Sequence, residues 1–184
     1  MTEVALTYSI VGLVVLYAGV VLSWFATKPG RHWLVVPCAV PIVGAIVFAL
    51  AGLPVVHPAL GILAGVGFVL LGSVGGSPFV SLVLDLATRD SVTLGAHGGI
   101  LVMSAAPPRE ILRGGAVIGY LERVSLIGSV LVGQPAAVAV IVAIKGLGRY
   151  SELENAAARE RFIIGTLASL LWAGACAAAI ALSW

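Results

Sequence analysis

Charged residues are scarce in this chain. Only 10% of its 184 residues are Asp, Glu, Lys or Arg, whereas 60% are hydrophobic, and the mean hydropathy is +1.14. Soluble domains carry about 25% charged and roughly 45–50% apolar residues. The composition therefore disfavours a soluble fold, and the net charge of +2 provides no basic surface for nucleic acid.

Cysteine and catalytic motifs are also nearly absent. Cys38 and Cys176 each stand alone in an apolar run, without a CxxC pair, which disfavours a zinc site or a redox dithiol. His32, His57 and His97 fall in expected loops without ligand spacing. The chain contains no Walker lysine, GxSxG or HExxH motif. We expect no metal site, no cofactor and no enzymatic activity.

Apolar runs of about 20 residues are abundant, and this is the length that crosses a hydrocarbon layer of about 30 Å. The pattern predicts an all-α, polytopic transmembrane helix bundle in a single domain with about six spans, one of them kinked or broken. The predicted spans cover residues 4–26, 33–53, 59–76, 111–132, 135–149 and 162–184.

The third span is expected to end at "GGSP", where Pro78 removes a helix hydrogen bond. The next segment places Ser81, Asp85 and Arg89 four residues apart. This polar stripe on an apolar helix predicts an interfacial helix over 79–89. A kinked third span that simply continues is the alternative.

Residues 90–107 form the longest connection, predicted to be a cytoplasmic loop containing a small hairpin or a re-entrant segment. The "SAAPPRE" sequence that follows predicts the start of the fourth helix. Its prolines are tolerated in a first turn, and Glu110 suits the positive end of the helix dipole.

Basic residues fall on one side of the six-span arrangement. By the positive-inside rule this side is the cytoplasm, so both termini are expected outside. The Ala-, Val-, Gly- and Arg-rich composition indicates a bacterial plasma membrane. The basic residues are Lys28, Arg31, Arg89, Arg109, Arg113, Lys145, Arg149, Arg159 and Arg161, with Arg123 inside the fourth span.

The fourth and fifth spans carry opposite charges at matching depth. Glu122 lies eleven residues before Gly133, and Lys145 lies eleven residues after Gln134. Both therefore lie roughly 16–17 Å below the turn, which predicts an ion pair, since a lone charge in a bilayer costs at least about 2.5–3.5 kcal/mol. Snorkelling of Lys145 to the headgroups is the alternative. The turn itself consists of Gly133, Gln134 and Pro135.

Arg123 points about 100° away from its neighbour on the helix. We expect it to snorkel to the cytoplasmic headgroups, or to meet Asp85 or a carbonyl from the "GGSP" break. These charges predict an intramembrane polar site. It serves either as an ion, proton or substrate route or as a helix-pairing ion pair with a snorkelling arginine. Its residues are Glu122, Arg123, Lys145 and Asp85.

The sixth span carries a stripe of small residues spaced four apart, which lets another helix approach closely. Packing within the chain is one interpretation, and a dimer seam or a partner helix is the other. The stripe consists of Gly165, Ser169, Ala173, Ala177 and Ala181.

The segments "LER", "GQ", "AIKGLGR" and "ERFIIGTLAS" follow one another over residues 118–172, about a third of the chain. Their order and spacing resemble a family of small bacterial integral-membrane proteins without established activity. The resemblance implies a multi-pass membrane protein and no reaction. The residues that carry it are Glu122, Arg123, Gln134, Lys145, Arg149, Glu160, Gly165, Thr166 and Ser169.

Two functions fit these features. We expect a membrane-embedded accessory or packing subunit, whose partners are the lipid bilayer and either a second copy or another membrane protein. The alternative is a small transporter, channel or substrate-binding subunit that uses the polar site. A lipid-modifying enzyme is a third class, which Asp85 and Asp90 support poorly because they form no larger acidic cluster.

Overall fold

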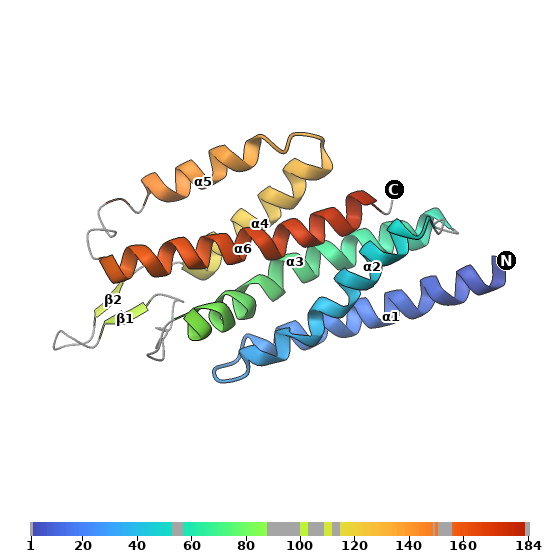
Figure 1. Ribbon diagram of the computed structural model, residues 1–184, viewed down its shortest axis with the longest axis horizontal. Coiled ribbons are helices and arrows are strands. Elements are labelled where there is room, and N and C mark those ends of the chain that lie inside the picture. The colour runs from blue at the N-terminus through green and yellow to red at the C-terminus, as the bar shows by residue number, and fades with distance from the viewer. Residues whose placement is uncertain are drawn as a thin grey trace.

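The computed structural model describes residues 2–52, 57–87, 100–102, 109–111, 115–148, 150 and 156–182. Within them the chain forms an elongated bundle whose helices run roughly along its long axis (Figure 1), which confirms the predicted all-α class. The elements are α1 (Thr2–Ala26), η1 (His32–Val35), η2 (Pro37–Ala39), α2 (Val40–Leu50), α3 (Pro58–Ala87), β1 (Ile100–Val102), β2 (Arg109–Ile111), α4 (Gly115–Leu131), α5 (Ala137–Leu147) and α6 (Ala156–Leu182).

Four helical stretches of the described chain are long and apolar enough to cross a membrane: Glu3–Ala26, His32–Leu50, Pro58–Ala87 and Ala158–Leu182. The other two predicted spans correspond to α4 and α5, which have 17 and 11 residues. These helices extend only about 25 Å and about 16 Å, against about 30 Å of hydrocarbon. Full crossing by α4 and α5 therefore stays a prediction.

The third helix does not end at Pro78. α3 is one helix of 30 residues, so the predicted span end at residue 76 and the separate interfacial helix over 79–89 are wrong. α1, α4 and α6 pack against α3, and side chains of α4 and α6 donate hydrogen bonds to its carbonyls just before the proline. These contacts hold the stretch of α3 before Pro78 against two neighbouring helices.

A two-stranded antiparallel sheet occupies the connection before α4. β1 pairs with β2 in the register Ile100↔Ile111, Leu101↔Glu110 and Val102↔Arg109. The predicted helix start at "SAAPPRE" is therefore wrong, because Glu110 lies in β2 and α4 begins at Gly115. Three of the six strand residues are β-branched, which favours extended backbone. The rest of the predicted 90–107 loop lies outside the described residues.

The core lies where α3 and α6 pack together. Trp172 of α6 is buried there, with its Nε1–H donating to the Leu71 carbonyl at 3.1 Å and its ring centroid 5.0 Å from that of Phe79. Both contacts are made to α3. A buried indole that is hydrogen-bonded in this way fixes the register of the two long helices.

The small-residue stripe of α6 contributes to this packing. Ser169, Ala173 and Ala177 are buried, Gly165 is half-buried, and Ala181 is exposed. Small side chains allow the helices to approach closely. Three of the five stripe residues are therefore buried by packing within the chain, whereas a dimer seam or a partner helix at this stripe stays a prediction.

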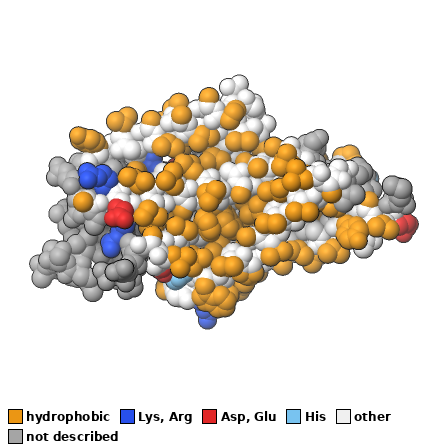
Figure 2. Space-filling view, in the orientation of Figure 1, with side chains coloured by type: hydrophobic (Ala, Val, Ile, Leu, Met, Phe, Trp, Pro, Cys, Tyr) orange, Lys and Arg blue, Asp and Glu red, His pale blue; other side chains and the backbone are white. Residues whose placement is uncertain are grey.

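The exterior of the bundle is mostly apolar. Hydrophobic side chains cover most of the visible face, and charged side chains gather toward the end where α6 begins (Figure 2). Val14 and Leu171, for example, are 65% and 68% exposed. An apolar surface of this extent fits contact with lipid. Both chain ends lie toward the opposite end of the bundle (Figure 1).

Candidate functional site

The candidate site is built on the α4–α5 hairpin, whose turn forms as predicted. Gly133 adopts a left-handed φ of 74°, which a residue with a side chain adopts only at a cost. Its N–H donates to the Val130 carbonyl (3.0 Å), and the N–H of Gln134 donates to the Ser129 carbonyl (2.8 Å). These two bonds form a Schellman motif that ends α4. Pro135 follows directly, so the chain reverses within a few residues.

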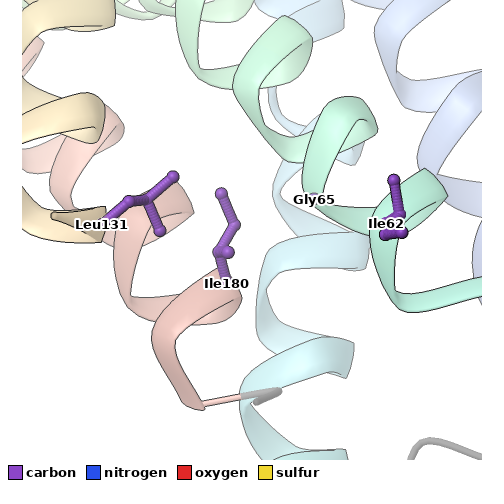
Figure 3. A pocket seen from close by; sticks show the side chains of 4 residues that line it. All are labelled: Ile62, Gly65, Leu131 and Ile180. Atoms are coloured by element: carbon purple, nitrogen blue, oxygen red, sulfur yellow. The ribbon is translucent and has the colours of Figure 1, made fainter. Parts of the chain in front are cut away.

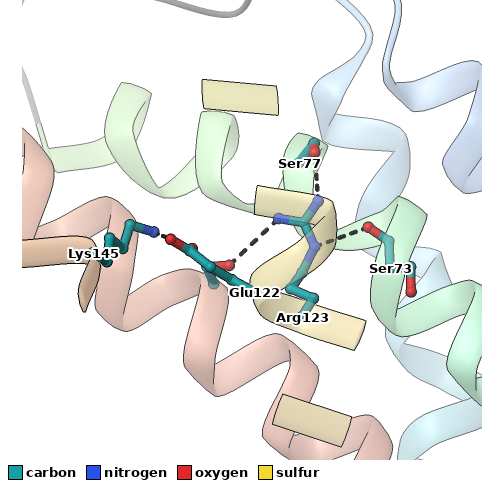
Figure 4. A network of polar contacts seen from close by, with 6 residues as sticks. Ser73, Ser77, Glu122, Arg123 and Lys145 are labelled. Atoms are coloured by element: carbon teal, nitrogen blue, oxygen red, sulfur yellow. Dashed lines mark hydrogen bonds and ion pairs between the residues drawn. The ribbon is translucent and has the colours of Figure 1, made fainter. Parts of the chain in front are cut away.

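The hairpin brings Glu122 and Lys145 together, and this confirms the predicted pair. Lys145 Nζ donates to Glu122 Oε2 (Figure 4), and the two side chains are only 16% and 12% exposed. The ammonium group also lies 5.9 Å from the ring centroid of Phe162 on α6. An opposite charge and an aromatic face both lower the cost of a cation away from water. Lys145 therefore does not snorkel.

Arg123 points to the other side of α4 and is 3% exposed. Its Nε donates to the Ser73 carbonyl at 2.8 Å. Its two terminal nitrogens donate to Ser77 Oγ at 2.9 Å and to Ser169 Oγ at 3.4 Å. Figure 4 shows the guanidinium group directed at α3. Arg123 neither snorkels nor meets Asp85. Its carbonyl partner, Ser73, lies two residues before "GGSP", and the motif itself supplies the Ser77 hydroxyl group.

Small residues make room for this buried guanidinium group. A Cβ atom at Gly76 would lie 2.4 Å from Arg123 Cδ, and one at Gly119 would lie 3.1 Å from a terminal nitrogen. The Tyr120 ring centroid lies 5.1 Å from Arg123 Cζ. Sequence reasoning missed Ser73 and these partners. The sequence signal was the "GGS" run, which we interpreted only as a helix break.

Asp85 does not belong to the polar site, so that part of the prediction is wrong. It lies eight residues beyond Ser77, about 12 Å along α3. Its Oδ2 is 2.9 Å from Nε2 of His32, and the two side chains are 35% and 28% exposed. The pair joins the end of α3 to η1. His32, predicted to be a plain loop residue, therefore has a specific partner.

Two buried side-chain oxygen atoms have no hydrogen-bond partner within the described part of the chain. They are Glu122 Oε1 and Thr166 Oγ1. Unpaired buried oxygens are uncommon, because each one loses its hydrogen bonds to water without replacement.

An open apolar pocket of about 360 Å³ lies elsewhere, between α3, α4 and α6. Ile62, Gly65, Leu131 and Ile180 line it (Figure 3). Leu131 is nine residues beyond Glu122, about 13 Å along α4. The pocket therefore lies away from the ionic groups and offers dispersion contacts only.

Among the described residues, no three His, Cys, Asp or Glu side chains lie close enough to hold a metal ion. The fold and the ionic groups together define an α-helical membrane protein with a buried polar cluster. Comparison of the chain with protein-family models, curated proteins and solved structures gave no match. The resemblance over residues 118–172 stays a prediction, and one of its residues, Arg149, lies outside the described chain.

Proposed function

We propose that this protein is a membrane-embedded accessory subunit, without catalytic activity, that packs against another membrane protein through α5. The supporting observation is the exposure of this helix, since none of its residues is buried. Val140, Ile144 and Leu147 are 58%, 65% and 76% exposed. Ala139 and Ala143 are also exposed on the same helix face.

The shape of α5 favours a protein partner over lipid alone. Its 11 residues cover about 16 Å of a hydrocarbon layer of about 30 Å. Backbone beyond a short helix needs protein or water around it at membrane depth. Ala139 and Ala143, four residues apart, allow a second helix to approach closely, with branched side chains beside them to pack into its grooves.

The buried charges fit a structural role in such a subunit. Arg123 satisfies acceptors on α3 and α6, and Lys145 ties α5 to Glu122 on α4. Buried polar pairs fix which helices meet and in which register. The inner face of α5 is held in this way, while its outer face stays available.

Purification in mild detergent tests the proposal. We expect a complex of fixed stoichiometry that Ala143→Trp disrupts, because the larger ring blocks close helix approach. Val14→Trp on the exposed face of α1 is the matched control, since Val14 is 65% exposed, and should leave the complex intact. A folded chain that purifies as a monomer from native membranes would overturn the proposal. The mass of the complex distinguishes another protein from a second copy.

A small transporter, channel or substrate-binding subunit is the second candidate. It is favoured by the Glu122 carboxylate, which keeps one buried oxygen unpaired among helices of membrane-spanning type. Such intramembrane charges commonly lie on ion or substrate routes. Ion or solute flux into proteoliposomes should fall with Glu122→Gln and not with Asp85→Asn. Equal flux in all three proteins would remove this candidate.

We also propose a bacterial plasma membrane with both termini outside. The basic residues Lys28, Arg31, Arg159 and Arg161 belong to segments at one end of the bundle, and both termini lie toward the other (Figure 1). The positive-inside rule assigns the basic end to the cytoplasm. Terminal tags should be digested by protease added to intact spheroplasts, and protection of both tags would reverse the orientation.

A further inference from the structure

The junction of α4, α5 and α6 has a property that helix packing does not require. We infer that it holds a binding site for one small hydrogen-bond donor, of the size of water or ammonium, between Glu122 Oε1 and Thr166 Oγ1. Both atoms are buried and unpaired within the described chain. The inference goes beyond the proposed packing function and does not depend on a partner protein.

Of the two residues, Thr166 gives the stronger evidence for a bound ligand. Its side chain is 8% exposed, so bulk water does not reach it. Several other hydroxyl groups of the bundle donate to a carbonyl of their own helix, as Ser73 does to Val69 at 2.7 Å and Ser129 does to Leu126 at 2.8 Å. Thr166 makes no such bond, which leaves both its proton and its lone pairs for a ligand.

Contacts on either side place Thr166 on the face of α6 that meets the charged residues of α4 and α5. Phe162, one turn before it on α6, lies beside the Lys145 ammonium group, which itself binds Glu122. Ser169, one turn after it, accepts from Arg123, the residue next to Glu122. Residues three and four apart share a helix face. Thr166 therefore lies between the two contacts that α6 makes with the charged groups.

The carboxylate oxygen of Glu122 and the hydroxyl group of Thr166 determine which class of ligand can bind. Glu122 Oε2 already accepts from Lys145, so Oε1 offers only lone pairs, and a carboxylate favours a donor. A small molecule with two or more O–H or N–H groups can bridge Oε1 and the threonine hydroxyl. Two or more polar partners are the usual minimum for a buried water. An anion would be repelled by the carboxylate.

Thermal unfolding of the protein in nanodiscs tests the site, because a bound ligand and an empty site predict opposite changes in melting temperature for the same variant. Thr166→Val keeps the shape of the side chain and removes the hydroxyl. With a ligand bound, this change leaves a donor unpaired, so the melting temperature should fall, and Thr166→Ser should restore most of the loss. The fall should be smaller in a Glu122→Gln background. Ser129→Ala is the control, because it removes only a bond to its own helix.

A melting temperature that rises or stays unchanged in Thr166→Val would overturn the inference, since an unpaired or self-bonded hydroxyl is better replaced by a methyl group. Salt substitution distinguishes the two ligands. A melting temperature raised by ammonium chloride, but not by potassium or tetramethylammonium chloride, and only when Thr166 is present, indicates ammonium. A lower melting temperature in Thr166→Val, together with no change in melting temperature on adding ammonium chloride, indicates that the ligand is water.

Discussion

Replacing Gly76 with alanine should destabilise the protein, although alanine favours helix. A Cβ atom at this position would lie 2.4 Å from Arg123 Cδ and 2.6 Å from its Nε. The arginine cannot easily move, because its Nε donates to the Ser73 carbonyl and Ser77 and Ser169 accept from its terminal nitrogens. Overpacking of this kind costs about 1–3 kcal/mol, against a helix-propensity gain of roughly 0.5–1 kcal/mol.

Gly65→Ala in the same helix is the matched control. A Cβ atom there meets nothing within 4 Å, so only the gain of roughly 0.5–1 kcal/mol remains. The melting temperature should fall for Gly76→Ala and rise for Gly65→Ala, by about 2–4 °C per kcal/mol in a chain of this size. Tryptophan fluorescence of the protein in detergent follows the transition.

The loss of stability in Gly76→Ala should also depend on the arginine side chain. In an Arg123→Met background the flexible thioether chain can move aside, so Gly76→Ala should lose most of its effect. A melting temperature that rises equally for both glycine variants would refute the reasoning, because it would mean that the guanidinium group does not occupy this position.

Three further predictions concern the hairpin and the α3 end. Glu122→Gln and Lys145→Met should each lower the melting temperature, and the double variant should lose less than the sum, because each single change strands a buried partner; additive losses in a double-mutant cycle would contradict this. Gly133→Ala should cost about 1–2 kcal/mol through its left-handed φ, which thermal unfolding can measure, whereas an equal effect of Gly128→Ala would disprove the turn argument. Asp85→Asn should change stability by less than about 1 kcal/mol, since its partner is partly exposed; a larger loss in the same assay would show a tighter pair.

The sequence predicted well those features that depend on counting along one helix or across one short turn. The Glu122–Lys145 pair followed from equal distances to Gly133, because a three-residue reversal leaves little freedom of register. The C-terminal cap followed from glycine itself. The helix class followed from apolar runs whose length matches a bilayer.

The sequence could not predict features that depend on how distant helices meet. Pro78 was expected to end a helix because local propensity disfavours it, and the packing of α6 and Arg123 on the same stretch of α3 reversed that outcome. The partner of Asp85 is His32, 53 residues away in the sequence, and no periodicity relates the two. The strand pairing of Glu110 likewise replaced a plausible helix start.

Arg123 and Glu122, adjacent on α4, bind different neighbouring helices, and this difference explains the position of α5. Arg123 binds inward to α3 and α6 through three hydrogen bonds, so α4 is firmly part of the bundle. Glu122 faces the other way and holds Lys145. α5 itself has no buried residue and packs mainly on α4. Its position therefore depends on the Gly133 turn, the ion pair to Glu122 and the packing of Val138 against the core, and its remaining apolar face is free for the partner helix that we propose.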